Sequence, residues 1–149
     1  MPERKLKIAE EAAIWKAVAA WVDAEGIAPV VLYLHGSRGT DWQRAESDWD
    51  FAVLCDQPLA WTQRMSLIDG LSRALDGSTI DLADLRQCDT VFAAHLVSEG
   101  EAIYIGDEAA RQRFEMLALA KYARLNEERH GILNDIRQRG TVYLATGQA

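Results

Sequence analysis

Two short pairs of residues in the first third of the chain could together bind a phosphorylated substrate. Gly36 and Ser37 follow an apolar segment, and Asp48 and Asp50 flank Trp49 at the start of the next one. Because side chains two positions apart on a strand point to the same face, we expect the two aspartates to project together, opposite Trp49. Adjacent carboxylates repel each other unless a cation lies between them, and such hard oxygen ligands suit magnesium. The spacing therefore predicts a magnesium site at Asp48 and Asp50.

The residues around the Gly-Ser pair are suited to binding phosphate. Gly36 lets the backbone approach a phosphate closely, and Ser37 offers a hydroxyl and an amide to phosphate oxygens. Arg38 and Arg44 lie in the connection between the two apolar segments. Both could contact a triphosphate, although loop arginines are commonly only solvated, and we rank them below the aspartates. His35 precedes the pair and is interpreted as a core or rim histidine more readily than as a ligand of the nucleotide.

A third carboxylate is needed to complete a two-metal site or to take the proton from an attacking hydroxyl. Asp81, in the segment 78–85, is the best candidate because this segment has the pattern of a strand. Asp84 falls on the opposite face of that strand and is interpreted as a turn or helix-cap residue. We therefore predict catalytic and metal-binding roles for Asp48, Asp50 and Asp81.

These residues must be positioned by helices and strands that alternate along the chain. The patterning of apolar residues and of Gly, Pro and Asp predicts the order α-β-β-α-β-α-β-α. The expected helices are 8 to about 26, 59–75, 90–98 and 108–139, and the expected strands are 30–34, 49–54, 79–85 and 101–105. The last helix has a long apolar stripe that only Arg129 interrupts.

The composition limits the class of protein. With 149 residues, 49% of them apolar, the chain can bury one core but is too short for two ordinary domains, so we predict one domain over residues 1–149. No apolar run is long enough to span a membrane, and the N-terminal segment lacks an apolar signal core. We therefore expect a cytoplasmic protein with no membrane partner.

The net charge and its distribution along the chain narrow the choice of partners. The net charge of −7 argues against direct binding of duplex DNA, because that affinity comes from Lys and Arg that neutralise phosphates. Residues 107–139 carry seven Lys or Arg and six Asp or Glu, and this mixed charge suits a protein partner.

Cys55 and Cys88 have no metal or redox spacing, so we expect both to be reduced residues of the core. Core packing is also expected for most of the five tryptophans.

The order of the two pairs resembles a known signature. Gly36-Ser37, ten residues and then Asp48-x-Asp50 are similar to the Gly-Ser-x10-Asp-x-Asp motif of the DNA polymerase β-like nucleotidyltransferase superfamily. With its short length and with Asp81 in a predicted strand, the chain resembles the minimal nucleotidyltransferase (MNT) family.

The resemblance covers about residues 25–106, and the terminal helices match only by type and position. His35 stands where an aromatic residue is common, and Trp49 stands where an aliphatic one is common, but neither change removes a ligand. The resemblance implies an α+β fold (an α/β sandwich) in which helices flank a small mixed sheet. A long C-terminal helical segment, about 107–140, would follow the core.

Many bacterial MNT proteins are the antitoxins of HEPN/MNT toxin-antitoxin pairs. The resemblance therefore implies transfer of AMP from ATP, with two magnesium ions, to a tyrosine of a HEPN ribonuclease toxin bound through helical surfaces. Two alternatives remain open. One is a noncatalytic antitoxin that occludes its partner, chiefly through the C-terminal helix. The other is an adenylyltransferase for a small hydroxylated compound such as an aminoglycoside, which the missing substrate domain disfavours unless a dimer builds the pocket.

Overall fold

The computed structural model describes residues 6–35 and 49–139. Each of the eight predicted elements is present in these ranges, with ends within two residues of those expected. The elements are α1 (Ile8–Glu25), β1 (Pro29–His35), β2 (Trp49–Cys55), α2 (Trp61–Ala74), β3 (Ile80–Asp84), α3 (Thr90–Glu99), β4 (Glu101–Ile105) and α4 (Glu108–Arg139).

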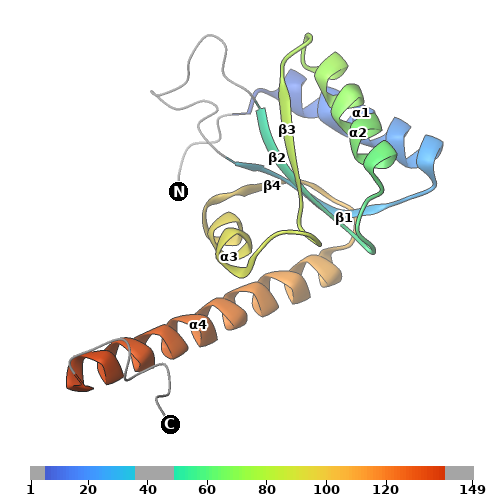
Figure 1. Ribbon diagram of the computed structural model, residues 1–149. Coiled ribbons are helices and arrows are strands. Elements are labelled where there is room, and N and C mark those ends of the chain that lie inside the picture. Colours follow the sequence, from blue (N-terminus) through green and yellow to red (C-terminus); the bar gives the residue numbers. More distant parts are fainter. Residues whose placement is uncertain (1–5, 36–48, 140–149) are drawn as a thin grey trace.

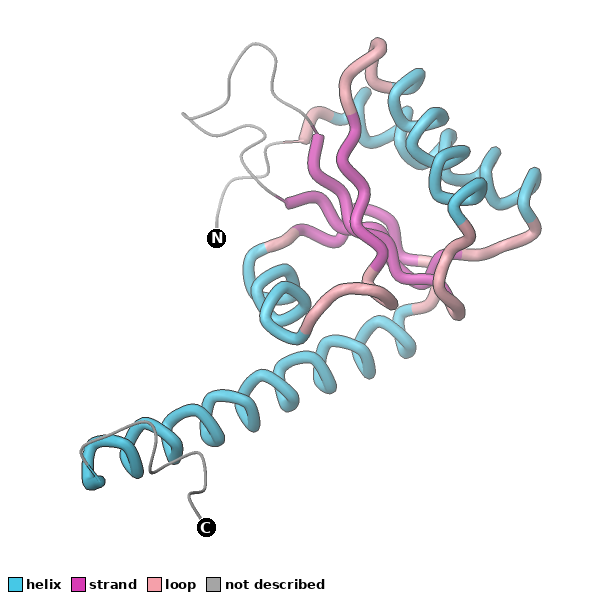
Figure 2. The backbone as a smooth tube through the Cα atoms, viewed as in Figure 1, coloured by secondary structure: helices cyan, strands magenta, loops and turns pink. Residues whose placement is uncertain are grey.

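The four strands form one mixed sheet in the order β3-β2-β1-β4. β1 pairs antiparallel with both β2 and β4, whereas β2 and β3 are parallel and are connected by α2. Helices α1 and α2 lie on one face of the sheet, and α3 and α4 lie on the other (Figure 1). The tube view in Figure 2 shows the same three layers. The predicted fold class, a small mixed sheet flanked by helices with a long C-terminal helix, is confirmed.

Each face of the sheet has its own apolar cluster. Alternate residues of β2 divide between the two, because successive side chains on a strand point to opposite faces. The cluster under α1 and α2 contains Trp49, Phe51 and Val53. The cluster under α3 and α4 contains Ala52 and Leu54. This division decides on which face the polar residues of the strands emerge.

The helix ends are set by local chemistry that the sequence already indicates. Asp89 caps α3 by accepting a 2.7 Å hydrogen bond from the backbone N–H of Phe92. α1 ends at Gly26, whose φ of 68° is the left-handed conformation that glycine adopts without strain. Trp21 on α1 then donates a 3.0 Å hydrogen bond to the carbonyl oxygen of Gln63, which links α1 to α2.

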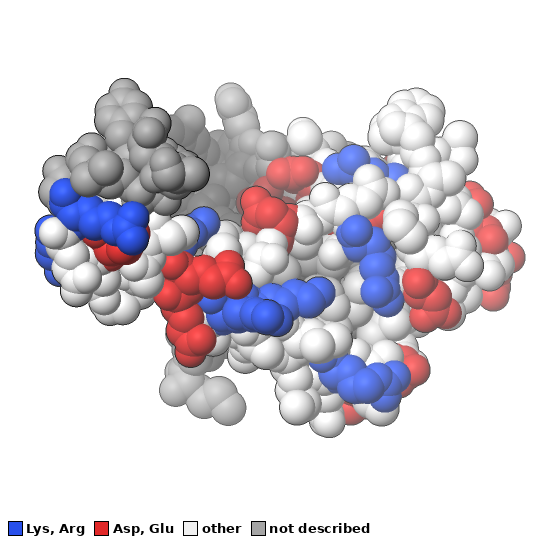
Figure 3. All heavy atoms as spheres, turned by 60° about the horizontal axis from the view of Figure 1, so that its bottom comes forward, with Lys and Arg blue, Asp and Glu red and all other residues white. Residues whose placement is uncertain are grey.

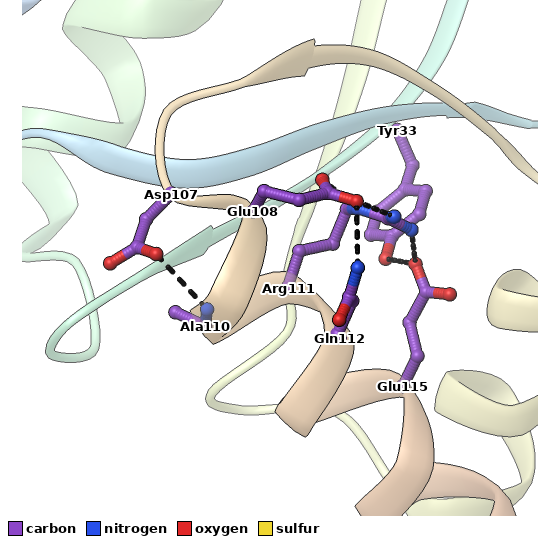
Figure 4. A network of polar contacts seen from close by, with 7 residues as sticks. All are labelled: Tyr33, Asp107, Glu108, Ala110, Arg111, Gln112 and Glu115. Atoms are coloured by element: carbon purple, nitrogen blue, oxygen red, sulfur yellow. Dashed lines mark hydrogen bonds and ion pairs between the residues drawn. The ribbon is translucent and has the colours of Figure 1, made fainter.

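α4 is attached to the sheet only by its first turns. Asp107 accepts a 3.0 Å hydrogen bond from the backbone of Ala110. Arg111 forms ion pairs with Glu108 and Glu115, and the buried Tyr33 donates a 2.6 Å hydrogen bond to Glu115 Oε2 (Figure 4). Burial, and then the hydrogen bond and the charge of Glu115, raise the pKa of Tyr33, so the phenol stays neutral.

The rest of α4 extends away from the body (Figure 1). Among the described residues of this helix only Ala118 is buried, and Ile132 and Leu133 are 56% and 55% exposed. The predicted apolar stripe is therefore present in the sequence but is not covered by the rest of the described chain. None of the helices in the two described ranges combines the length and apolar character that a membrane span requires.

The cysteine and tryptophan predictions are only partly correct. Cys55 is buried, and burial raises its pKa to about 12, whereas Cys88 is half-buried, and neither forms a disulfide. Trp21 and Trp49 lie in the core. Trp61 is 72% exposed, which core packing does not explain.

Candidate functional site

The parallel pairing of β2 and β3 places Asp50 and Asp81 opposite each other as Cα partners. The following pair in the register is Phe51 and Leu82, both fully buried under α1 and α2. Since side chains alternate along a strand, Asp50 and Asp81 project from the opposite face, on the side of α3 and α4. Asp50 is half-buried and Asp81 is exposed. The structure thus brings together two of the three predicted carboxylates, on one face and on neighbouring strands.

Asp84 is a structural residue, as its position on the strand predicts. Its side chain is buried and accepts hydrogen bonds from the backbone N–H groups of Leu59, at 2.8 Å, and Arg86, at 2.9 Å. The amide of Gln87 donates a third hydrogen bond at 3.1 Å. A buried carboxylate with three donors is satisfied within the fold, so Asp84 fastens the turn after β3 to the segment before α2.

His35, at the end of β1, is the Cα partner of Asp50 on β2. Its ring is half-buried and meets the ring of Phe92 on α3 edge-on, with centroids 5.6 Å apart. Position and contact agree with the prediction of a rim histidine that borders the site. Phe92 was not predicted to lie near the site, because nothing in the spacing of residues 35 and 92 indicates that α3 crosses the end of β1.

The remaining predicted site residues cannot be placed. Gly36, Ser37, Arg38, Arg44 and Asp48 lie outside the described residues. They belong to the connection between His35 and β2, both ends of which are described. The described residues that border this connection, His35 and Trp49, both lie next to Asp50, the first as its Cα partner and the second in the chain.

The donor chemistry of the described pair fits a hard divalent cation. Two carboxylates at the same register on parallel strands can contribute oxygen ligands to one ion, and magnesium is usually held by one or two carboxylates together with substrate phosphates. The residues that the structure describes contain no group of three or more His, Cys, Asp and Glu side chains placed to hold a metal. The third predicted ligand, Asp48, lies outside them.

Comparison with known proteins identifies the class. Residues 24–109 match the family described as polymerase beta, nucleotidyltransferase, and this match spans the sheet with α2 and α3. The chain belongs to this nucleotidyltransferase family. Within it, the chain is similar to the protein adenylyltransferase MntA of Shewanella oneidensis, with 34% identity over 71% of this chain and 75% of that protein. It is also 32% identical to the MntA of Aphanizomenon flos-aquae over 52% of this chain and 59% of that protein.

Solved structures of toxin-antitoxin complexes also contain chains that are similar to this one. A toxin-antitoxin structure with AMP-PNP contains a chain that is 31% identical, with a TM-score of 0.66 over 85% of this chain and 98% of that one. A structure of the tri-AMPylated HEPN toxin of Shewanella oneidensis in complex with the MNT antitoxin matches with a TM-score of 0.63 and 29% identity, over 86% of this chain and 96% of that one. The fold expected from the Gly-Ser and Asp-x-Asp signature is therefore confirmed.

Proposed function

We propose that this chain is an antitoxin that transfers AMP from ATP to a tyrosine hydroxyl of a HEPN ribonuclease toxin and thereby neutralises it. The observation that carries the proposal is the register of Asp50 and Asp81, which brings two carboxylates together on one face of neighbouring strands. The MntA relatives, named protein adenylyltransferases, and the similarity to the antitoxin bound to an AMPylated HEPN toxin support it.

The two described carboxylates differ in exposure, and this difference suits different roles. The acceptor oxygen attacks the α-phosphorus of ATP, the bond from that phosphorus to the bridging oxygen breaks, and pyrophosphate leaves. Asp81 is exposed, so its carboxylate is accessible to a tyrosine hydroxyl and is the residue that we assign to accept its proton. Asp50 is half-buried between His35 and Asp81, and we assign it to holding the nucleotide in place through the cation.

The residues outside the described ranges complete the proposed site. We assign Gly36 and Ser37 to the phosphates of ATP, with Arg38 and Arg44 as further phosphate contacts. Asp48, Asp50 and Asp81 are the proposed ligands of magnesium. Magnesium, when bound, would neutralise charge on the triphosphate and on the leaving pyrophosphate.

The proposed partner is a HEPN-type protein that docks on helical surfaces. The exposed half of α4, with its mixed charge and its uncovered apolar residues, provides such a surface. It also supports a second candidate function, in which the chain neutralises its partner by occlusion without chemistry. The two candidates differ in whether the carboxylates are needed for protection.

A direct experiment tests the proposed reaction. The purified chain is incubated with ATP, magnesium and a HEPN-type protein with which it forms a complex, and the intact mass of that protein is then measured. We expect an increase by one or more AMP masses, which requires both ATP and the chain. An unchanged mass under conditions where the two proteins form a complex would contradict AMP transfer to this partner and leave occlusion as the means of neutralising it.

A further inference from the structure

A hollow of about 550 Å³ lies between α3 and α4. Its lining includes Val91, Phe92, His95, Ser98 and Glu99 from α3, and Tyr122 from α4. The volume is within the range of about 300 to 1,000 Å³ that is usual for ligand pockets. We refer to it as the interhelical hollow.

The interhelical hollow borders the candidate site at one residue, Phe92. The ring of Phe92 lines the hollow and also meets the ring of His35 edge-on. His35 is the Cα partner of Asp50, and Asp50 is the Cα partner of Asp81. A group that lies in the hollow and extends past Phe92 therefore meets His35, the strand neighbour of Asp50.

The lining has a chemistry that favours one kind of occupant. Phe92, Tyr122 and the 40% exposed Val91 offer aromatic and apolar surface to a ring. Asp89 and Glu99 add two carboxylates, and among the described residues that line this hollow there is no Lys or Arg. Glu99 pairs with His95 and Asp89 caps α3, but both carboxylates keep their negative charge, which repels a triphosphate and attracts basic side chains. The lining therefore suits a tyrosine with basic neighbours better than it suits a nucleotide.

The long helix offers a path to the hollow. Tyr122 of α4 lines the hollow, and the rest of the helix extends away from the sheet (Figure 1). Basic and acidic side chains are interspersed on the surface seen in Figure 3 rather than gathered in one patch. A protein that docks along α4 is thereby held next to the hollow.

We infer that the interhelical hollow binds the tyrosine-bearing segment of the acceptor protein, with basic residues of that segment beside Asp89 and Glu99. This inference rests on the proposed function, because it assumes that the acceptor is a protein tyrosine. It adds the place where the acceptor lies and the chemical character of the segment that is recognised.

Charge reversal at Glu99 tests the inference against a matched control. Glu99 pairs with His95, and its side chain is 71% exposed; Asp69 on α2 pairs with Arg73, and its side chain is 70% exposed. Glu99→Lys and Asp69→Lys thus make the same change in net charge at equally exposed sites on opposite faces of the sheet. Lysine in the last turn of α3 also suits the helix dipole, so the fold is not expected to suffer.

We expect Glu99→Lys to raise the Kd for the HEPN-type protein about tenfold, and Asp69→Lys to leave it unchanged. Both variants should bind a nonhydrolysable ATP analogue as the wild type does. Equal changes of this Kd in the two variants would overturn the inference. A changed affinity for the ATP analogue that is confined to Glu99→Lys would also overturn it, because the hollow would then belong to the nucleotide.

Cross-linking locates the segment without depending on catalysis. A photoreactive benzoylphenylalanine replaces Val91 in the hollow or, as a control, Met65 on α2, which are 40% and 41% exposed. Without ATP, position 91 should capture a peptide of the HEPN-type protein that contains a tyrosine and basic residues, and position 65 should not. This capture would support the inference even if the wild type transferred no AMP, a result that would contradict only the proposed reaction. Capture, at position 91, of a segment without a tyrosine would refute the inference about the hollow.

Discussion

Asp50 and Asp81 occupy the same register on parallel strands although 30 residues separate them in the chain. We predict that Asp50→Asn and Asp81→Asn each reduce AMP transfer by about a thousandfold or more, because a lost carboxylate removes electrostatic stabilisation worth several kcal/mol. Transfer is measured as radiolabel from ATP that becomes attached to the HEPN-type protein. Asp56→Asn is the control, since Asp56 is exposed just past the other end of β2 and should be neutral. Wild-type rates in either site variant would exclude the proposed mechanism.

The hydrogen bond from Tyr33 to Glu115 fastens α4 to the sheet. Tyr33→Phe should lower the free energy of unfolding by about 1 to 2 kcal/mol, because Glu115 loses a buried donor but keeps Arg111. Chemical denaturation measures the change. Tyr104→Phe is the matched control, since the Tyr104 ring packs against Trp15, whereas within the described part of the chain it is the Tyr33 hydroxyl that bonds to α4. Equal losses in the two variants would show that the Tyr33 hydroxyl has no special role.

The ion pair between Arg111 and Glu108 leads to a prediction about the pKa of Glu108 and the pH dependence of stability. Hydrogen bonds from Arg111 and then Gln112 lower the pKa of Glu108 from 4.5 to about 2. A carboxyl with a lowered pKa adds stability that is complete above pH 4.5 and is lost as the pH falls through about 2. An NMR titration of the Glu108 carboxyl should therefore show a midpoint near 2, and Arg111→Ala should move it up toward 4.5. A midpoint unaffected by Arg111→Ala would contradict this cause.

Gly106, directly after β4, leaves no room for a side chain. A Cβ atom there would overlap the carbonyl oxygen of Pro29, a backbone atom that cannot move without disturbing β1. Gly106→Ala should therefore cost about 1 to 3 kcal/mol of stability. Gly131→Ala, on the exposed part of α4 where nothing lies within 4 Å, should instead stabilise by up to about 1 kcal/mol. Thermal unfolding of both variants checks the opposite signs.

The sequence predicted the elements well because their signals are local. Apolar periodicity marks the faces of α1 and β2, and Gly26 marks a helix end through its own backbone conformation. The same-face projection of Asp50 follows from strand alternation alone. The pairing of Asp50 with Asp81 does not follow from strand alternation. The register of the two parallel strands depends on how α2, which connects them, packs against the sheet.

Other features could not be predicted because they depend on contacts between distant segments. Periodicity shows that α4 has an apolar stripe, but only the fold shows that most of the helix extends past the sheet. Trp61 is likewise an apolar residue whose exposure the sequence does not reveal. The contact of Phe92 with His35 follows from the path of α3 across the end of β1, and no motif records it.

The last prediction separates the enzyme from an occluding antitoxin. A variant with both Asp50→Asn and Asp81→Asn should still bind the HEPN-type protein, because exchanging carboxylates for amides leaves the exposed surfaces of α3 and α4 unchanged. If AMP transfer neutralises the toxin, this variant should bind but fail to protect cells that express the toxin.

Coexpression followed by intact mass measurement distinguishes the two functions in one experiment. Wild type should protect the cells and add AMP to the toxin, whereas the double variant should form the complex, add no mass and give no protection. A control variant with Asp56→Asn and Asp69→Asn carries the same number of amides away from the site and should behave as wild type. Full protection by the Asp50 and Asp81 double variant without added mass would establish occlusion as the mechanism, and the fold assignment would be unaffected.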